Sequence, residues 1–212
     1  KQFPEVFARP ESGFDIVIGN PPWERLKLQE REFFSLSSPE IASAVSAADR
    51  RKLITQIERQ NPQLWDRYQK AKARAEAHSN YVRSCGTFPL AGRGDVNTYM
   101  LFAELARHIV APSGCVGLLV PSGIATDDTT KHFFNDLMEG KSLIALYDFE
   151  NRRLLFPDVD GRFKFCVLLM GGSKVQTPAA DFVFFAHGTE DLKETDRHIE
   201  LTDKDLKLLN RN

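Results

Sequence analysis

The chain has 212 residues, of which 42% are hydrophobic and 27% charged, and its formal net charge is −1 at pH 7. This length and composition are ordinary for one globular domain with a sizeable core. The net charge argues against a uniformly basic nucleic-acid binder, and the apolar runs are far shorter than the roughly 18 residues that span a bilayer. Three widely spaced cysteines without metal-ligand spacing indicate neither a disulfide framework nor a zinc site, which fits a reducing cytoplasm.

The charges are unevenly distributed along the chain. Residues 50–83 carry nine Lys and Arg against three acids, whereas residues 181–209 carry eight acids against four basic residues. Such asymmetry can aim an anionic ligand at one end of a molecule. The basic segment is a candidate for following nucleic-acid phosphates, and a solvated helical face explains it equally well.

The predicted elements alternate between strands and helices. The apolar run 14–18 is typical of a strand buried on both faces of a parallel sheet, and the polar, Ala-containing segment 24–83 predicts helices. Ser38-Pro39 and Asn61-Pro62 are plausible helix starts, and Gly and Pro make 85–95 a loop. Further helices are expected at 99–110, 129–138 and 202–209, and further strands at 115–120, 143–149, 165–170 and 182–186.

This pattern predicts an α/β fold with a layered, parallel sheet. Ligands of such sheets bind beyond the carboxyl ends of the strands. Asn20, Pro121 and the 150–162 loop all follow predicted strands. We therefore expect them to gather at one edge of the sheet.

The most informative motif is Asn20-Pro21-Pro22-Trp23, which directly follows the first predicted strand. Asn offers a carbonyl acceptor and two N–H donors, and two prolines stiffen the backbone beside it. Trp23 adds a flat face on which a planar ligand can stack. The tetrapeptide suits recognition of an amino group on a nucleobase, although a strand-ending turn with a packed Trp would share its sequence.

Three blocks in order resemble the amino-methyltransferases of DNA: the strand with Asn20–Trp23, residues 94–102 (GDVNTYMLF) and residues 114–123 (GCVGLLVPSG). The chain is most similar to the N6-adenine enzymes of type IIG restriction-modification systems and of related phage-defence methyltransferases, over roughly residues 1–172. The resemblance implies a Rossmann-like methyltransferase sheet, S-adenosylmethionine as cofactor, and double-stranded DNA with a flipped adenine as partner.

The resemblance also assigns roles to the motif residues. The side-chain oxygen of Asn20 and the backbone carbonyl of Pro21 would accept the hydrogens of the adenine amine, with Pro22 and Trp23 completing the catalytic motif. Trp23 would stack on the flipped base, and Phe156 or Phe163 would supply a second aromatic ring. Ordinary packing is an equal alternative for Phe156.

Cofactor and DNA-backbone roles are implied for residues outside the motif. Asn20, Asn97, Tyr99 and Phe102 are expected to line the cofactor pocket, although Tyr99 and Phe102 also fit a buried helical stripe. The expected contacts to the DNA backbone are the loop arginines Arg93, Arg152, Arg153 and Arg162. No metal is expected, because the spacing of Asp148, Asp158 and Asp160 matches no Ca²⁺ or Mg²⁺ loop.

The sequence departs from the family in one respect. The family's glycine-rich cofactor turn precedes the Asn-Pro-Pro block, and only 19 residues precede it here. We therefore expect the C-terminal part of a catalytic domain that is inactive alone, with the upstream half and the target-recognition domain elsewhere in the same polypeptide. In this interpretation residues 1–23 and 84–190 are the partial catalytic domain, 24–83 a helical insertion, and 191–212 a linker.

Two alternative functions stay open from the sequence. The same acceptor chemistry serves methyltransferases that act on RNA or on a protein glutamine, although the long insert after Trp23 favours a DNA enzyme. The absence of the glycine-rich turn from this chain instead favours a non-catalytic nucleic-acid-binding remnant.

Overall fold

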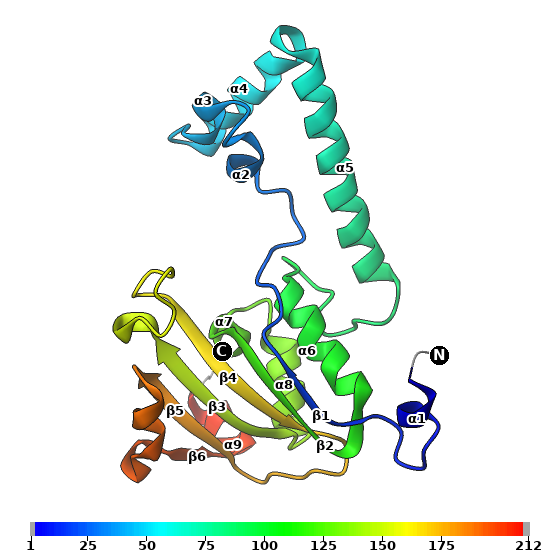
Figure 1. Ribbon diagram of the computed structural model, residues 1–212, viewed down its shortest axis with the longest axis vertical. Helices are drawn as coiled ribbons and strands as arrows, with labels where there is room; N and C mark the ends of the chain where they lie inside the picture. The colour runs from blue at the N-terminus through cyan, green and yellow to red at the C-terminus, as the bar shows by residue number, and fades with distance from the viewer. Residues whose placement is uncertain (1–2, 210–212) are drawn as a thin grey trace. The chain divides into compact units, whose positions relative to one another are not determined.

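The computed structural model describes residues 3–209 and divides the chain into two compact units. The first consists of residues up to Trp23 together with those from Thr98 onward, and the second is the segment Glu24–Asn97. Figure 1 labels the elements of both units. None of the helices within the described residues is long and apolar enough to cross a membrane.

The first unit is built on a six-stranded sheet in the order β1-β2-β4-β3-β5-β6. The strands are β1 (Phe14–Gly19), β2 (Val110–Pro121), β3 (Leu143–Glu150), β4 (Lys164–Gly171), β5 (Ala180–Ala186) and β6 (Ile199–Leu201). The helices of this unit are α1 (Pro4–Phe7), α6 (Thr98–Ile109), α7 (Gly123–Thr126), α8 (Lys131–Glu139) and α9 (Asp203–Leu209), with short 3-10 turns at Asn151–Arg153, Thr189–Lys193 and Thr195–Arg197. The predicted α/β class and its Rossmann-like arrangement of strands and helices are confirmed.

The prediction of a wholly parallel sheet is wrong. β1 pairs parallel with β2, and β3 pairs parallel with β5, but β4 lies antiparallel between β2 and β3. Strand β4 follows β3 through a loop rather than a helical crossover, which permits an antiparallel neighbour. Because β2 and β3 both oppose β4, they run in the same direction as each other. The carboxyl ends of β1, β2, β3 and β5 therefore meet at one edge, as the sequence predicted.

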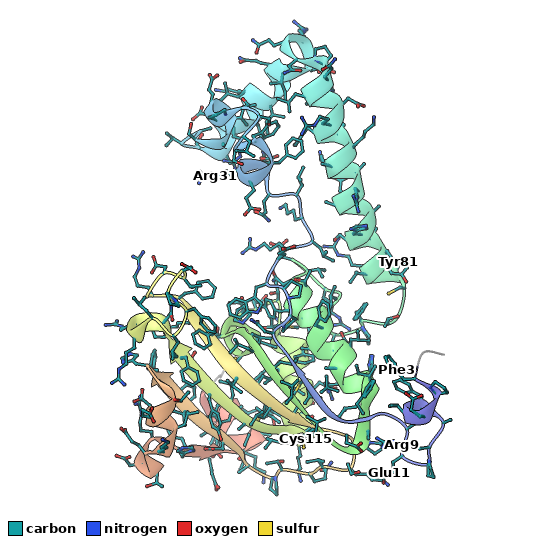
Figure 2. All side chains as sticks on the ribbon, viewed as in Figure 1. Phe3, Arg9, Glu11, Arg31, Tyr81 and Cys115 are labelled. Carbon is teal, nitrogen blue, oxygen red and sulfur yellow. The ribbon has the colours of Figure 1, made fainter. Side chains whose placement is uncertain are left out.

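Strand β1 is also not buried on both faces. Among the described residues it is an edge strand that pairs with β2 alone, and Ile16 and Ile18 are 67% and 82% exposed. Their partners in register on β2 are Cys115, which is exposed and labelled in Figure 2, and Gly117, which is half-buried. Val116, which lies between them, is buried. One face of the sheet is thus covered at β2 and the other is open. Figure 1 shows α6 and α8 on a single face of the sheet.

The second unit is helical and has its own core. Its helices are α2 (Glu30–Phe34), α3 (Pro39–Ala42), α4 (Ala47–Gln60) and α5 (Pro62–Ser84). The predicted starts at Pro39 and Pro62 are confirmed, and the Asn61 side chain caps α5 by accepting a hydrogen bond from the Leu64 amide. The buried residues of this core are Phe34, Ile41, Ile54, Ile57, Leu64 and Tyr68.

The two ends of the helical unit are tied together by backbone hydrogen bonding. The Leu26 amide donates to the Val96 carbonyl at 2.9 Å, and Arg25 and Asn97 form an antiparallel bridge. Residues 84–97, expected in the catalytic domain, therefore group with the helices. In the first unit, residues 199–201 of the expected linker form β6 and pair with β5.

Candidate functional site

The motif residues line a hollow at the carboxyl edge of the sheet. The cavity has a volume of about 410 Å³ and is bounded by Asn20, Pro21, Pro22, Trp23, Phe156, Val159, Phe163 and Phe165. All of these residues belong to the first unit. The structure therefore brings together the predicted catalytic motif and both predicted stacking residues of the loop after β3.

Asn20 presents an unused amide to solvent at this hollow. Its side chain is exposed, and within residues 3–209 no group hydrogen-bonds to that side chain or to the carbonyl oxygen of Pro21. Thr98, the first residue of α6, donates to the Pro22 carbonyl at 2.6 Å and fixes the turn from its far side. The motif thus offers two free oxygen acceptors on a backbone held by two prolines and one hydrogen bond.

Trp23 is held firmly in place. Its indole Nε1 donates to the Leu119 carbonyl of β2 at 3.3 Å. The ring of Phe163 is stacked on the indole, with the ring centroids 5.6 Å apart and the planes at 6° to each other. Phe163 is 40% exposed. The hollow therefore holds a half-buried indole with a second aromatic ring stacked on it.

Phe156 forms part of the floor. Its ring meets Phe165 edge-on, with the centroids 5.2 Å apart and the planes 77° apart, and Phe165 itself is buried. Phe165 stacks in turn on Phe149 of β3. Phe156 is thus packed against the core of the sheet and still borders the cavity, so the packing and ligand-lining interpretations both hold for this ring.

The loop carrying both phenylalanines is organised by Asn151, which sequence reasoning missed. Asn151 is fully buried. Its Nδ2 donates to the carbonyls of Phe156 and Val159, both at 2.9 Å, and its Oδ1 accepts from the Phe156 amide at 3.0 Å. The backbone N–H of Asn151 also donates to the Phe163 carbonyl at 3.0 Å. A single Asn in a loop sequence gives no signal of this kind, because its burial depends on the fold of the loop.

The loop arginines carry compensated charges. Arg162 donates to both carboxylate oxygens of Asp160 and lowers the pKa of that carboxyl to about 2. Arg152 lies 2.7 Å from Glu150 and lowers its pKa by hydrogen bonding, and Arg153 lies 3.9 Å from Asp191. Arg93 belongs to the other unit, where its Nε donates to the Pro89 carbonyl.

The residues expected around the cofactor are less well assembled. Phe102 on α6 is 47% exposed, whereas Tyr99 is only 4% exposed. Neither lines the hollow, and Asn97 belongs to the helical unit. These residues fit an adenine-bearing cofactor only in part, through Asn20 and Phe102. Among the described residues, no cluster of His, Cys, Asp and Glu could hold a metal ion.

Comparison with known proteins gives only distant likenesses in structure. No family model and no curated protein matches the sequence. A Listeria monocytogenes protein assigned as a class I S-adenosylmethionine-dependent methyltransferase is similar with a TM-score of 0.41 and 14% identity, over 56% of this chain and 35% of that one. The ATP-dependent Type ISP restriction-modification enzyme LlaBIII bound to DNA is similar with a TM-score of 0.46 and 8% identity, over 87% of this chain and 12% of that one.

The DrdV–DNA complex is similar with a TM-score of 0.46 and 11% identity, over 87% of this chain and 17% of that one. The chain thus spans between 12% and 35% of the length of these three proteins. Likenesses of this size do not assign a function.

Proposed function

We propose that this chain supplies the target-base site of an S-adenosylmethionine-dependent DNA methyltransferase that acts on the N6 amine of adenine, in a restriction-modification or phage-defence system. The observation that carries the proposal is the pair of unused acceptors, Asn20 Oδ1 and the Pro21 carbonyl, beside the Trp23 indole. A planar ring with an exocyclic amine matches this combination, because the ring stacks and the amine donates two hydrogens.

The proposed chemistry needs positioning rather than a protein nucleophile. The lone pair of the adenine amine is delocalised into the ring, so the amine is a poor nucleophile. Two acceptors aimed at its hydrogens favour the pyramidal form, in which the lone pair is localised on nitrogen. When bound, S-adenosylmethionine would supply an electrophilic sulfonium methyl: as the N–C bond formed, the S–CH3 bond would break, S-adenosylhomocysteine would leave and the amine proton would pass to water.

The aromatic residues hold the base in this proposal. A base within duplex DNA has to be flipped out of the stack before its amine can reach Asn20. Trp23 would cover one face of the flipped ring and Phe163 the other, with Phe156 at the floor. Base–aromatic stacking is worth about 1–3 kcal/mol per base, which offsets the cost of extruding it.

For the cofactor, Asn20 and the exposed ring of Phe102 are the residues of this chain that would contact it. Asn97 and Tyr99 are weaker candidates. The RNA and protein-glutamine methyltransferase alternatives use the same acceptors. Two aromatic rings beside the acceptors favour a planar nucleobase over the small glutamine side chain.

The test is methyl transfer from labelled S-adenosylmethionine to adenine-containing duplex DNA by the full-length protein. Asn20→Ala should abolish transfer and weaken binding of this duplex by no more than about fivefold, because the side chain makes no hydrogen bond to the described residues and only one hydrogen bond to the base is lost. Asn135→Ala is a matched control, since this exposed Asn on α8 lies outside the hollow. Full activity of Asn20→Ala would refute the proposed role.

A further inference from the structure

The helical unit Glu24–Asn97 is basic, whereas the remainder of the chain is acidic. It carries thirteen Lys and Arg against nine Asp and Glu, a net charge of +4, and the rest of the chain therefore carries −5. The middle of α5 is polar and largely exposed: between Tyr68 and Val82 none of its residues is buried. Ion pairs along the helix, such as Asp66–Lys70, stabilise this polar segment and leave its exposed sides available to a ligand.

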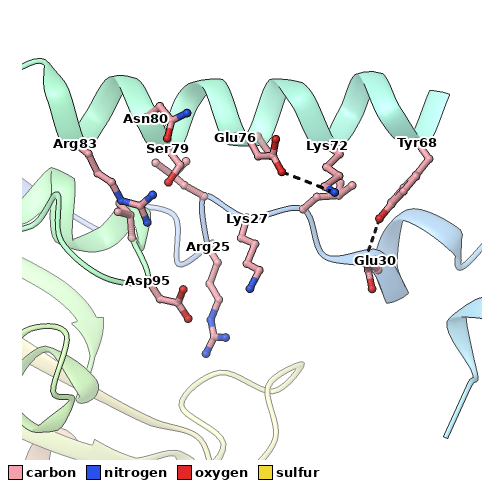
Figure 3. A pocket seen from close by; sticks show the side chains of 14 residues that line it. Arg25, Lys27, Glu30, Tyr68, Lys72, Glu76, Ser79, Asn80, Arg83 and Asp95 are labelled. Carbon is pink, nitrogen blue, oxygen red and sulfur yellow. Dashed lines mark hydrogen bonds and ion pairs between the residues drawn. The ribbon is translucent and has the colours of Figure 1, made fainter. Parts of the chain in front are cut away.

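This unit has a cavity of its own, with a volume of about 410 Å³. It lies between α5 and the extended segment before α2, and all of its lining residues belong to the unit. Figure 3 shows these side chains: Tyr68, Lys72 and Glu76 with Glu30 at one end, and Ser79, Asn80 and Arg83 with Arg25 and Asp95 at the other.

The acids at the first end are neutralised within the unit. Glu30 accepts hydrogen bonds from the Tyr68 hydroxyl and from Arg50 Nε, both at 3.0 Å. Burial and Glu30 together raise the pKa of Tyr68 to about 12, so the phenol stays a donor. Glu76 lies 4.0 Å from Lys72. These carboxylates are already compensated and repel an incoming anion only weakly.

The cations at the other end are not neutralised. Arg25 and Lys27 are exposed, and within residues 3–209 neither side chain has an ion-pair partner. Arg83 donates at 2.7 Å to the Gly94 carbonyl, which bears no charge. Ser79 and Asn80 add a hydroxyl and an amide beside Arg83 on α5, and Asp95 lies beside Arg25.

We propose that this cavity and its rim bind the sugar–phosphate backbone of duplex DNA, with Arg25, Lys27 and Arg83 as the cations and Ser79 and Asn80 as neutral donors. Phosphate oxygens accept hydrogen bonds from side chains of these four types, Arg, Lys, Ser and Asn. The assignment rests on the proposed function only for the choice of DNA as the polyanion. It places backbone contact in the helical unit rather than on Arg152, Arg153 and Arg162, whose charges are compensated.

The experiment measures the affinity of the 212-residue chain for a fluorescein-labelled 30-base-pair duplex of arbitrary sequence, by anisotropy between 50 and 200 mM KCl. For the double variant Arg25→Gln/Lys27→Gln, the slope of log Kobs against log[salt] should fall in magnitude by about 1.8, because each phosphate contact contributes about 0.9. The wild-type chain should therefore lose about 12-fold more affinity than the variant over this fourfold rise in salt.

The matched control is Lys131→Gln/Lys193→Gln, which removes the same charge from exposed lysines of the acidic unit. Its slope should equal that of the wild type. Equal slopes for both double variants, or no binding by the wild-type chain at 50 mM KCl, would overturn the proposal. A result of either kind would leave the Asn20 methylation test unaffected, so the two proposals fail separately.

A second measurement requires no variant. DNA should protect Lys27 from acetylation in the wild-type chain at least fivefold, while Lys193 reacts at the same rate with and without DNA. Equal reactivity of Lys27 in both conditions would count against the proposal, even if the double variant failed to fold.

Discussion

The stack of Phe163 on Trp23 makes a quantitative prediction about base binding. With the centroids 5.6 Å apart and the planes almost parallel, there is no room for a third ring. Two stacking separations of about 3.5 Å each require about 7 Å between the outer rings. A flipped base can therefore enter between them only if the existing stack opens, and Phe163 on its exposed loop is the ring free to move.

The free energies of this exchange follow from typical magnitudes. Each base–ring stack gained is worth about 2 kcal/mol, and opening the Trp23–Phe163 stack costs about 1 kcal/mol. Trp23→Ala or Phe163→Ala loses one base–ring stack of about 2 kcal/mol, but no Trp23–Phe163 stack of about 1 kcal/mol has to be opened. Each single variant should therefore weaken binding by about 1 kcal/mol, or fivefold. The double variant should lose about 3 kcal/mol, which exceeds the sum of the single losses.

The assay is fluorescence titration of a duplex that carries 2-aminopurine opposite an abasic site, because such a base is readily extruded and its emission is quenched on stacking. Phe184→Ala is the control, since Phe184 is similarly exposed but lies on β5, outside the hollow. Tighter binding by Phe163→Ala would refute the sandwich, because it would mean that Phe163 only blocks the Trp23 face. Equal affinities for all four proteins would refute base binding at this hollow.

Three further outcomes concern stability. Asn151→Ala should lower the free energy of unfolding by about 3 kcal/mol in urea titrations, because three side-chain hydrogen bonds of a fully buried Asn are lost; a loss below 1 kcal/mol would contradict its role in the loop. Ile18→Thr should change that free energy by less than about 0.5 kcal/mol, whereas Leu168→Ala should cost about 2–5 kcal/mol, because Ile18 is 82% exposed and Leu168 fully buried. His198 pairs with Asp181 at 2.7 Å, which raises the His198 pKa above 6.5. The contribution of this pair to the free energy of unfolding is therefore complete below about pH 6.5 and disappears as the pH rises through the raised pKa. The difference in Tm between wild type and His198→Gln should therefore be larger at pH 6 than at pH 9, and an equal difference would contradict the pairing.

The sequence predicted those parts of the fold that depend on local signals. Apolar runs located β3 and β4 within one residue of the observed bounds, and Pro39 and Pro62 marked two helix starts correctly. The same argument located β1 but was wrong about its burial, because a continuous apolar strand can be buried on both faces or lie at an open edge. Only the pairing of strands, which is not local, distinguishes the two cases.

The candidate site was predictable to a similar depth. The Asn-Pro-Pro-Trp motif and the strand ends that flank it placed Asn20, Trp23, Phe156 and Phe163 at one edge of the sheet, where the hollow lies. Asn151 could not be found in this way, since its importance arises from burial and three hydrogen bonds within one loop. The compensation of Arg152, Arg153 and Arg162 by nearby acids likewise depends on side-chain geometry.

Discrimination between adenine and purine, which lacks the exocyclic amine, tests the role of the two acceptors most directly. Titrations would compare duplexes that present either base opposite an abasic site. We expect the wild-type protein to prefer adenine by about 2 kcal/mol, or 30-fold, from two hydrogen bonds of about 1 kcal/mol each. Asn20→Ala should lose about half of that free-energy preference. Equal wild-type affinities for adenine and purine would contradict amine recognition by Asn20 and Pro21.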